Sequence, residues 1–236
     1  MSFVINPYRF GGGAPPGGDI PTGYFAEYLF DTDGSDTSGN GYTATLFLNA
    51  AVSGGVLQLD GAGDRATIAD TDDFSFTDGA GTDEAFSISA WIRPTQAIGT
   101  AEIIATKCGL AFEWEFQTDG SGLLQLVIYN NNASAYIFGR SGSTYVQNTW
   151  LHVVVTYDGS EASTGIEVYL DGTNDTTTQD GVGSYTGMTN SGNNVGIGSR
   201  AGTAASEFQG DMDNIRFYNR ELTLSEVGDL FAEGHS

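Results

Sequence analysis

The chain has 236 residues, with 30 acidic side chains against 8 basic ones and a formal net charge of −22. This charge repels polyphosphates at long range and excludes a nucleic-acid partner. The single cysteine, Cys108, excludes an intramolecular disulfide framework and a zinc site built on cysteines. No stretch reaches membrane-spanning length and the opening lacks the pattern of an export signal, so we expect no membrane insertion and no export signal in the chain as given.

Composition predicts an all-β protein with a short N-terminal arm. The chain contains 34 glycines, and Thr, Ser, Asn and Asp fill the gaps between short apolar runs, as in many strands joined by turns. Residues 1–21 form a separate segment, in which an apolar opening leads into GGGAPPGG. We interpret this segment as a disordered tail or as an anchor that orders on a partner. Residues 22–236 then form one β-domain.

The first predicted strand, Tyr24–Phe30, leads into the acidic loop Asp31–Tyr42, and a clear alternating strand follows at Ala85–Pro94. Two strands, Trp150–Tyr157 and Ile166–Leu170, form a hairpin. Both faces of the first of these carry bulky side chains, which indicates a position inside its sheet. The polar residues 173–194 predict a weakly ordered stretch. One helix is predicted near the end, over Leu222 to Phe231, with Thr223 or Ser225 as its N-cap.

Several segments occur in the order found in laminin G-like domains. They are FDTDGSDTSGNGY, GGVLQLDGAGDRATI, FSISAWIRP, NTWLHVVVTYDGS, IEVYLDGT, NNVGIGSR and FQGDMDNIRFYNRELTLSEVGDL. Residues 24–231 therefore resemble the laminin G-like, concanavalin A-like jelly-roll domains. The resemblance implies a two-sheet antiparallel β-sandwich, commonly with one bound Ca²⁺ where the first strand meets the last.

The residues that would hold this calcium ion come from both ends of the domain. Asp31, Asp36 and Asn40 lie in the first loop, and Asp213 stands where similar domains carry an aspartate before their last strand. Asp211 is the substitute if Asp213 points away. The alternative is that Asp31 and Asp36 only cap turns through hydrogen bonds to backbone amides.

Aromatic side chains predict a surface on which sugar rings can stack. The candidates are Trp91, Trp114, Tyr129, Tyr136 and Tyr145, although most aromatic residues of a sandwich belong to its core. Tyr129, Asn130, Asn131 and Asn132 are the preferred carbohydrate-binding residues, because a polar tip between two strands is exposed.

Catalysis is not expected. Glu113 and Glu115 alternate with Phe112, Trp114 and Phe116, so both carboxylates share one face of a strand. Such a pair is the arrangement of retaining glycosidases. The sequence lacks the further acid that laminarinase-type enzymes carry on this strand, and we expect the two glutamates to line a solvated or sugar-facing surface. His152 is expected to be a packed strand residue.

These observations predict a non-enzymatic virion protein, a decoration or attachment protein that displays a lectin-like sandwich. The opening MSFVINPYRFGGG resembles the start of small phage structural proteins. The arm would dock on capsid or tail proteins, the domain would bind a host or environmental polysaccharide, and self-assembly into a homo-oligomer is a further expectation. The alternative is a free carbohydrate-binding module or lectin with an extracellular location. A polysaccharide-active glycosidase or lyase ranks third.

Overall fold

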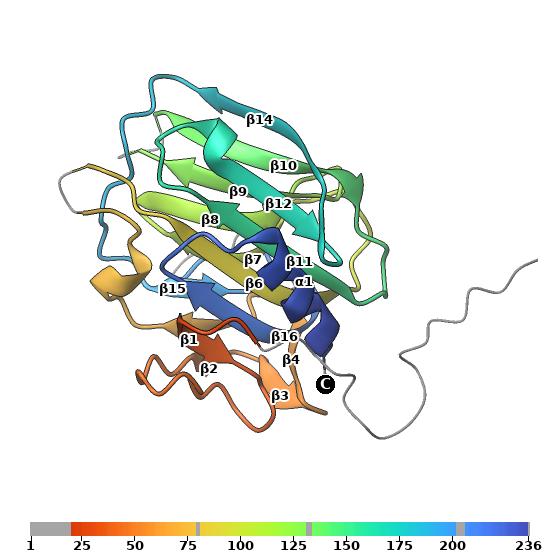
Figure 1. Ribbon diagram of the computed structural model, residues 1–236. Helices are drawn as coiled ribbons and strands as arrows, with labels where there is room; N and C mark the ends of the chain where they lie inside the picture. Colours follow the sequence, from red (N-terminus) through yellow and green to blue (C-terminus); the bar gives the residue numbers. More distant parts are fainter. Residues whose placement is uncertain (1–19, 79–80, 131–133, 202–205, 236) are drawn as a thin grey trace, which may run out of the picture.

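Two antiparallel β-sheets pack face to face in the computed structural model (Figure 1). The structure describes residues 20–78, 81–130, 134–201 and 206–235. The fold confirms the predicted all-β sandwich. Residues 1–19, which make up nearly all of the predicted arm, lie outside the described residues.

Sheet A follows the order β13-β12-β11-β6-β16-β4-β3, and β1 pairs with β16 beside β4. The first and last strands of the domain therefore lie side by side. The bounds in sheet A are β1 Tyr24–Tyr28, β3 Ala51–Ser53, β4 Val56–Asp60, β6 Phe86–Pro94, β11 Leu151–Tyr157, β12 Ile166–Leu170, β13 Thr173–Asn174 and β16 Gln209–Tyr218.

Sheet B follows the order β14-β10-β9-β8-β7-β15-β5-β2. Each neighbouring pair is antiparallel. The bounds in sheet B are β2 Thr45–Phe47, β5 Arg65–Ile68, β7 Glu102–Cys108, β8 Phe112–Thr118, β9 Leu123–Tyr129, β10 Tyr136–Thr144, β14 Thr176–Val182 and β15 Val195–Ile197.

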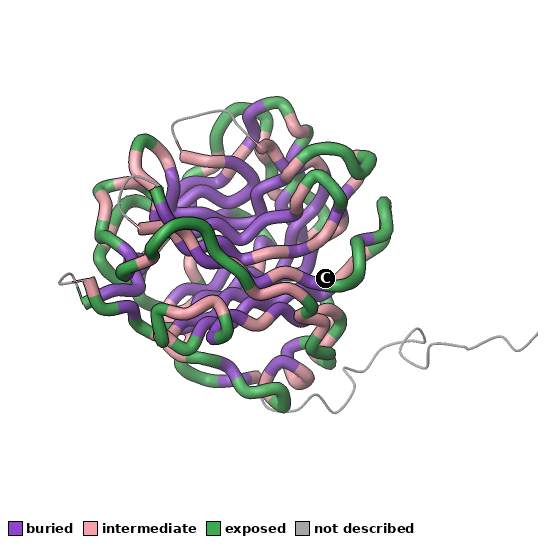
Figure 2. Tube along the Cα trace, turned by 90° about the horizontal axis from the view of Figure 1, so that it is seen from above, coloured by how far each residue is buried: buried purple, intermediate pink, exposed green. Residues whose placement is uncertain are grey.

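The core lies between the sheets and is built from alternate residues of each strand. Sheet B contributes Trp114 and Phe116 from β8, while Phe217 of β16 comes from sheet A. The ring centroids of Trp114 and Phe217 are 6.1 Å apart. Buried residues run through the middle of the molecule, and exposed residues gather in the connecting loops (Figure 2). The residues of β8 between these aromatic positions must therefore point away from the core.

The helix α1 (Leu224–Glu233) covers the outer face of sheet A. Its Val227 and Leu230 pack with Val154 of β11 and Tyr218 of β16. Thr223 caps the helix, since its hydroxyl accepts from the Glu226 backbone N–H and the Glu226 carboxylate accepts from the Thr223 backbone N–H. The predicted helix and one of its two predicted caps are thus confirmed. Within the described part of the chain, no helix has both the length and the apolar character that crossing a bilayer requires.

The predicted hairpin is confirmed, since β11 pairs with β12, and β11 lies inside sheet A between β12 and β6. The prediction of a weakly ordered stretch at residues 173–194 is wrong for its first half. Strands β13 and β14 lie there, and β14 pairs with β10 over Tyr136 to Ser141. Backbone hydrogen bonds to β10, rather than an apolar side-chain pattern, hold this polar segment as a strand.

The buried His152 of β11 predicts a loss of stability in acid. Burial first, and the charge of Arg216 second, lower the pKa of His152 from 6.5 to about 3. Between these values the unfolded chain binds a proton that the folded chain does not, so the free energy of unfolding falls as the pH falls from 6.5 to 3. The slope from this residue approaches about 1.4 kcal/mol per pH unit.

Urea unfolding of the wild type and His152→Gln at several pH values measures this slope. Glutamine retains an amide that can reach Ser89 Oγ, the partner of His152 Nε2 at 3.0 Å, but does not titrate. We expect the variant to lose the His152 part of the pH dependence. Equal slopes for both proteins would contradict the prediction.

Candidate functional site

Sheet B presents an outer face that α1, which lies on sheet A, does not cover. The strand register places side chains of β8, β9 and β10 in three cross-strand rows on this face. We call this surface the sheet B face. It comprises Tyr129 and Tyr136 in one cross-strand row, Glu115, Val127 and Phe138 in the next, and Gln117, Gln125 and Arg140 in the third. Glu113 lies on the same side of β8 as Glu115.

Aromatic rings from β8, β9 and β10 follow one another on the sheet B face, and we call this series of rings the aromatic row. The centroids of Tyr129 and Tyr136 are 5.6 Å apart, and those of Tyr136 and Phe138 are 6.4 Å apart. Phe112, at the start of β8, continues this row at 5.3 Å from Tyr129. All four side chains are partly exposed. Partly exposed rings of this kind offer apolar faces on which a ligand can stack.

Two glutamines lie opposite each other at the other end of the face. Gln117 of β8 pairs in register with Gln125 of β9. Gln125 is partly exposed and Gln117 is 8% exposed. Neither side-chain amide hydrogen-bonds to another described residue. Each amide thus has a carbonyl oxygen and an NH₂ group to offer to a ligand.

The middle of the face is held by a charged pair. Arg200 donates from Nε to Glu115 Oε1 at 2.5 Å and from Nη2 to Oε2 at 3.0 Å. Tyr129 donates its hydroxyl to the same Oε2 at 2.9 Å. Burial, followed by the charge of Glu115, raises the pKa of Tyr129, so its hydroxyl stays protonated and orients the ring. The Arg200 guanidinium also lies over the Phe112 ring, 5.3 Å from its centroid.

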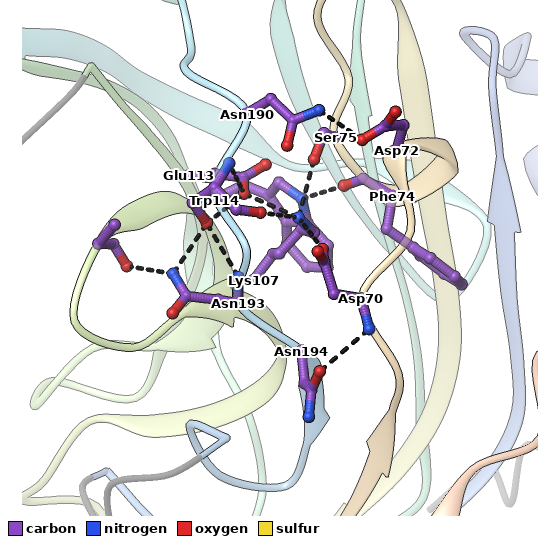
Figure 3. A network of polar contacts seen from close by, with 12 residues as sticks. Asp70, Asp72, Phe74, Ser75, Lys107, Glu113, Trp114, Asn190, Asn193 and Asn194 are labelled. Carbon is purple, nitrogen blue, oxygen red and sulfur yellow. Dashed lines mark hydrogen bonds and ion pairs between the residues drawn. The ribbon is translucent and has the colours of Figure 1, made fainter.

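A buried lysine, Lys107, lies at the centre of a polar network that includes Glu113 of the sheet B face (Figure 3). Lys107 Nζ donates to Ser75 Oγ at 2.8 Å, to Glu113 Oε1 at 2.9 Å and to the Ser191 carbonyl at 2.8 Å. Asp70 Oδ1 lies 2.8 Å from the same nitrogen. The side chains of Lys107 and Glu113 are both fully buried. This network ties the segments around residues 70–75 and 190–194 to β7 and β8.

The prediction that Glu113 and Glu115 line a solvated or sugar-facing surface is wrong. They do share one face of β8, but both are 0% exposed, because Lys107 and Arg200 neutralise them and neighbouring segments cover them. Burial raises the pKa of Glu113, and the Lys107 charge and the Ser191 hydrogen bonds offset only part of this effect. Both carboxylates therefore serve the structure of the site.

The predicted tip residues are only partly within the described chain. Tyr129 belongs to the sheet B face, as described above. Asn130 closes the turn after β9, since its Oδ1 accepts from the Ala135 backbone N–H at 2.9 Å. Asn131 and Asn132 lie outside the described residues, so their proposed role stays a prediction.

The three aspartates among the four predicted calcium ligands do not form a group that could hold a metal ion within the described part of the chain. Asp36 accepts hydrogen bonds from the backbone N–H groups of Glu27, Ser38, Gly41 and Tyr42. Burial raises the pKa of Asp36, but these hydrogen bonds outweigh burial and lower it. This is the turn-capping role that the sequence left open as the alternative.

The remaining predicted ligands are held in other ways. Asn40 donates from Nδ2 to the Phe25 carbonyl, and Asp31 is exposed. Asp213 is buried in β16 opposite Trp91, and its Oδ1 accepts from the Asn214 N–H. The substitute, Asp211, pairs with Arg93.

Among the described residues, no three His, Cys, Asp or Glu side chains form a group that could hold a metal ion. The arrangement supplies no ready calcium site, and calcium binding stays a prediction.

Three of the five aromatic candidates belong to the interior. Trp114 is 0% exposed, Tyr145 is 3% exposed, and Trp91 is 8% exposed beneath Phe231 of α1. His152 is also a packed strand residue, as predicted. Its Nδ1 has no hydrogen-bond partner among the described residues, so the Ser89–His152 contact lacks the carboxylate of a catalytic triad.

The sequence prediction missed Phe138, Gln117, Gln125 and Arg200 as site residues. The alternation of Tyr136, Phe138 and Arg140 along β10 was a usable signal for Phe138. Gln117 and Gln125 have no local signal, because their opposition depends on strand register. Arg200 joins Glu115 across 85 positions in the sequence.

The two antiparallel sheets define the class of jelly-roll, lectin-like sandwich folds. Residues 60–228 match the model of the concanavalin A-like lectin/glucanases superfamily, and the chain belongs to that superfamily. This confirms the resemblance found in the sequence. No curated protein sequence matches the chain.

Several solved structures share the fold. The binding domain of Paraclostridial Mosquitocidal Protein 1 is similar at 16% identity and a TM-score of 0.69, over 89% of this chain and 52% of that chain. Domain 4 of AbnA, a GH43 extracellular arabinanase from Geobacillus stearothermophilus, was solved with arabinotriose and is similar at 20% identity and a TM-score of 0.65, over 88% of this chain and 98% of that chain. The botulinum neurotoxin serotype D ligand-binding domain, in complex with N-acetylneuraminic acid, is similar at 13% identity and a TM-score of 0.61, over 89% of this chain and 50% of that chain. The chain thus spans about half the length of the mosquitocidal and neurotoxin domains.

The buried ion pair predicts a strong dependence of stability on Lys107. Lys107→Met leaves Glu113 and Asp70 without their cation, and breaking a buried pair from one side costs about 3–5 kcal/mol. Arg93→Met is the matched control, because the Arg93 side chain is 41% exposed and its pair with Asp211 is expected to contribute about 0–1 kcal/mol. Urea unfolding of the three proteins compares these losses. A loss for Lys107→Met no larger than that of the control would contradict the assignment.

Proposed function

We propose that the chain is a non-enzymatic, lectin-like domain that binds glycans on the sheet B face. The observation that supports this most strongly is the row of partly exposed rings formed by Tyr129, Tyr136 and Phe138. Sugar rings carry apolar C–H faces that stack on aromatic rings, and their hydroxyl groups suit the amides of Gln117 and Gln125. Two of the similar structures reported above were solved with a sugar ligand, arabinotriose or N-acetylneuraminic acid, which agrees with this proposal.

The non-enzymatic assignment rests on the state of the two carboxylates. A retaining glycosidase needs one carboxylate to attack the sugar and another to protonate the leaving oxygen. Glu113 and Glu115 are fully buried and paired with Lys107 and Arg200. Neither carboxylate can approach a glycosidic bond in this arrangement. Two of the three similar structures are described as binding domains, which agrees with a binding role.

The setting that we propose is a virus particle, on which the domain is a decoration or attachment protein. This part of the proposal rests on the sequence, namely on the apolar and glycine-rich residues 1–21 that would dock on capsid or tail proteins. Mass spectrometry of purified particles tests it, and absence of the protein from particles would instead favour the free extracellular lectin.

Calcium binding is a separate proposal that rests on the resemblance, and calorimetric titration with calcium chloride tests it.

Removing one ring of the row is expected to weaken glycan binding. Phe138→Ala deletes a partly exposed ring, and a loss of about tenfold in affinity corresponds to about 1.4 kcal/mol. Phe47→Ala is the matched control, since Phe47 is a 38% exposed ring on β2, at the opposite edge of the same sheet from β14. Calorimetry with the oligosaccharide that binds best in a glycan-array screen measures both. Equal effects of the two substitutions would place the site elsewhere.

A further inference from the structure

The charges around the sheet B face cancel in pairs. Glu115 is paired with Arg200, as described above. In the third cross-strand row, Arg140 Nη1 lies 3.2 Å from Asp119 Oδ2. Lys107 neutralises Glu113. Each cation near the face is therefore already bound to a carboxylate of this chain.

Elsewhere in the described part of the chain, no further lysine or arginine is free to serve this face. Of the eight lysine and arginine residues, Arg9 lies outside the described residues, and six of the other seven form ion pairs: Arg93, Lys107, Arg140, Arg200, Arg216 and Arg220. The seventh, Arg65, donates to the Gly63 carbonyl and lies over the Phe47 ring. It belongs to β5, which is three strands from β8 and so about 14 Å away at about 4.8 Å per strand. Both histidines contact Trp91, which lies on the outer side of sheet A.

One carboxylate beside the face has no cation. Asp180 of β14 stands opposite Phe138 of β10 in the strand register, so both side chains are on the same side of the sheet. Asp180 is exposed, and its hydrogen bond is to the neighbouring Gly181 N–H. Among the described residues, a negatively charged ligand on the aromatic row would therefore meet a carboxylate and no free cation.

The polar groups that do remain available are uncharged. The amides of Gln117 and Gln125 each provide a donor and an acceptor, which matches a hydroxyl group and does not compensate a full negative charge. Releasing Arg200 to bind an anion would leave Glu115 buried without its partner, which carries a large cost in free energy. Binding of an anionic sugar would have to overcome that cost.

We infer that the ligand of the sheet B face is a neutral oligosaccharide, without sialic acid, uronic acid or sulfate groups. This inference rests on the proposed glycan-binding function. It separates the chain from the similar neurotoxin domain that was solved with N-acetylneuraminic acid. The acidic surface alone does not account for this choice, because a formal charge of −22 acts at long range and salt screens it, whereas the missing cation is a local property.

The experiment is a binding comparison on the full chain with two sets of probes. Neutral probes are arabino-, xylo- and β-gluco-oligosaccharides, and acidic probes are sialyllactose, oligogalacturonate and heparin oligosaccharides. Both sets are measured at about 0.15 M and about 1 M salt, where the screening length falls from about 8 Å to about 3 Å. We expect a neutral probe to bind at both salt concentrations and the acidic probes to fail at both.

Two variants localise the effect. Gln117→Ala/Gln125→Ala should weaken binding of the neutral probe by about tenfold, equivalent to about 1.4 kcal/mol. Asp180→Lys places an unpaired cation on the exposed edge strand and should confer measurable binding of an acidic probe, whereas Asp180→Asn should not. Thermal unfolding of each variant confirms that it is folded.

The outcomes separate this inference from the proposed function. Binding of an acidic probe by the wild type at either salt concentration, at an affinity equal to or above that of the neutral probes, would overturn the neutral assignment and leave glycan binding in place. Binding of neither set would overturn the proposed function and this inference with it. Neutral binding that is unaffected by the double glutamine variant would overturn the assignment to the sheet B face.

Discussion

The arrangement of sheet B depends on the neutralisation of the carboxylates that β8 carries on its outer side. Glu113 and Glu115 lie fully buried between the sheet and the segments that cover it. An uncompensated buried charge costs several kcal/mol, so each carboxylate needs a compensating partner within contact distance. Lys107 on the adjacent strand and Arg200 after β15 meet this need. The segments around residues 70–75 and 190–194 are consequently tied to the sheet, and the ends of the face are defined.

A buried cation that pairs with carboxylates is also found on sheet A. Arg216 of β16 is 2.7 Å from Glu27 of β1 and also pairs with Glu233 of α1, so one buried guanidinium links the first strand, the last strand and the helix. A chain with only eight lysine and arginine residues thus uses most of them inside its own structure. The acidic surplus is left without cations, and the buried Asp64, Asp83 and Glu102 are held by hydrogen bonds instead. The scarcity of cations thus limits which buried carboxylates can form ion pairs.

The sequence predicted the parts of the fold that local patterns determine. Bulky side chains on both faces of Trp150–Tyr157 indicated a strand inside a sheet, and Thr223 was one of the two predicted N-caps of the last helix. The polar strand β14 escaped prediction, because its sequence TTTQDGV has little apolar periodicity and its pairing with β10 is a tertiary effect. The sequence correctly placed Asp36 in a turn-rich loop. It could not decide whether the Asp36 carboxylate caps a turn or binds a metal, because that depends on which backbone amides surround the carboxylate in space.

The candidate site shows the same division between local and distant causes. Alternation correctly placed Glu113 and Glu115 on the face opposite Trp114, and Tyr129 and Tyr136 were among the aromatic candidates. Whether the two glutamates face solvent could not be predicted, because Arg200 and the residue 190–194 segment reach them from far along the chain.

A shared fold does not determine the charge of a ligand, because recognition depends on the residues of the site. Strand register sets the shape of the sheet B face, whereas its charge depends on which cations are free. Freeing Arg200 would cost about 3–5 kcal/mol, a large part of the roughly 5–15 kcal/mol that stabilises a typical domain. The neutrality of the face is therefore a consequence of how β8 is buried, and a change of ligand charge would require a new cation from outside this pair.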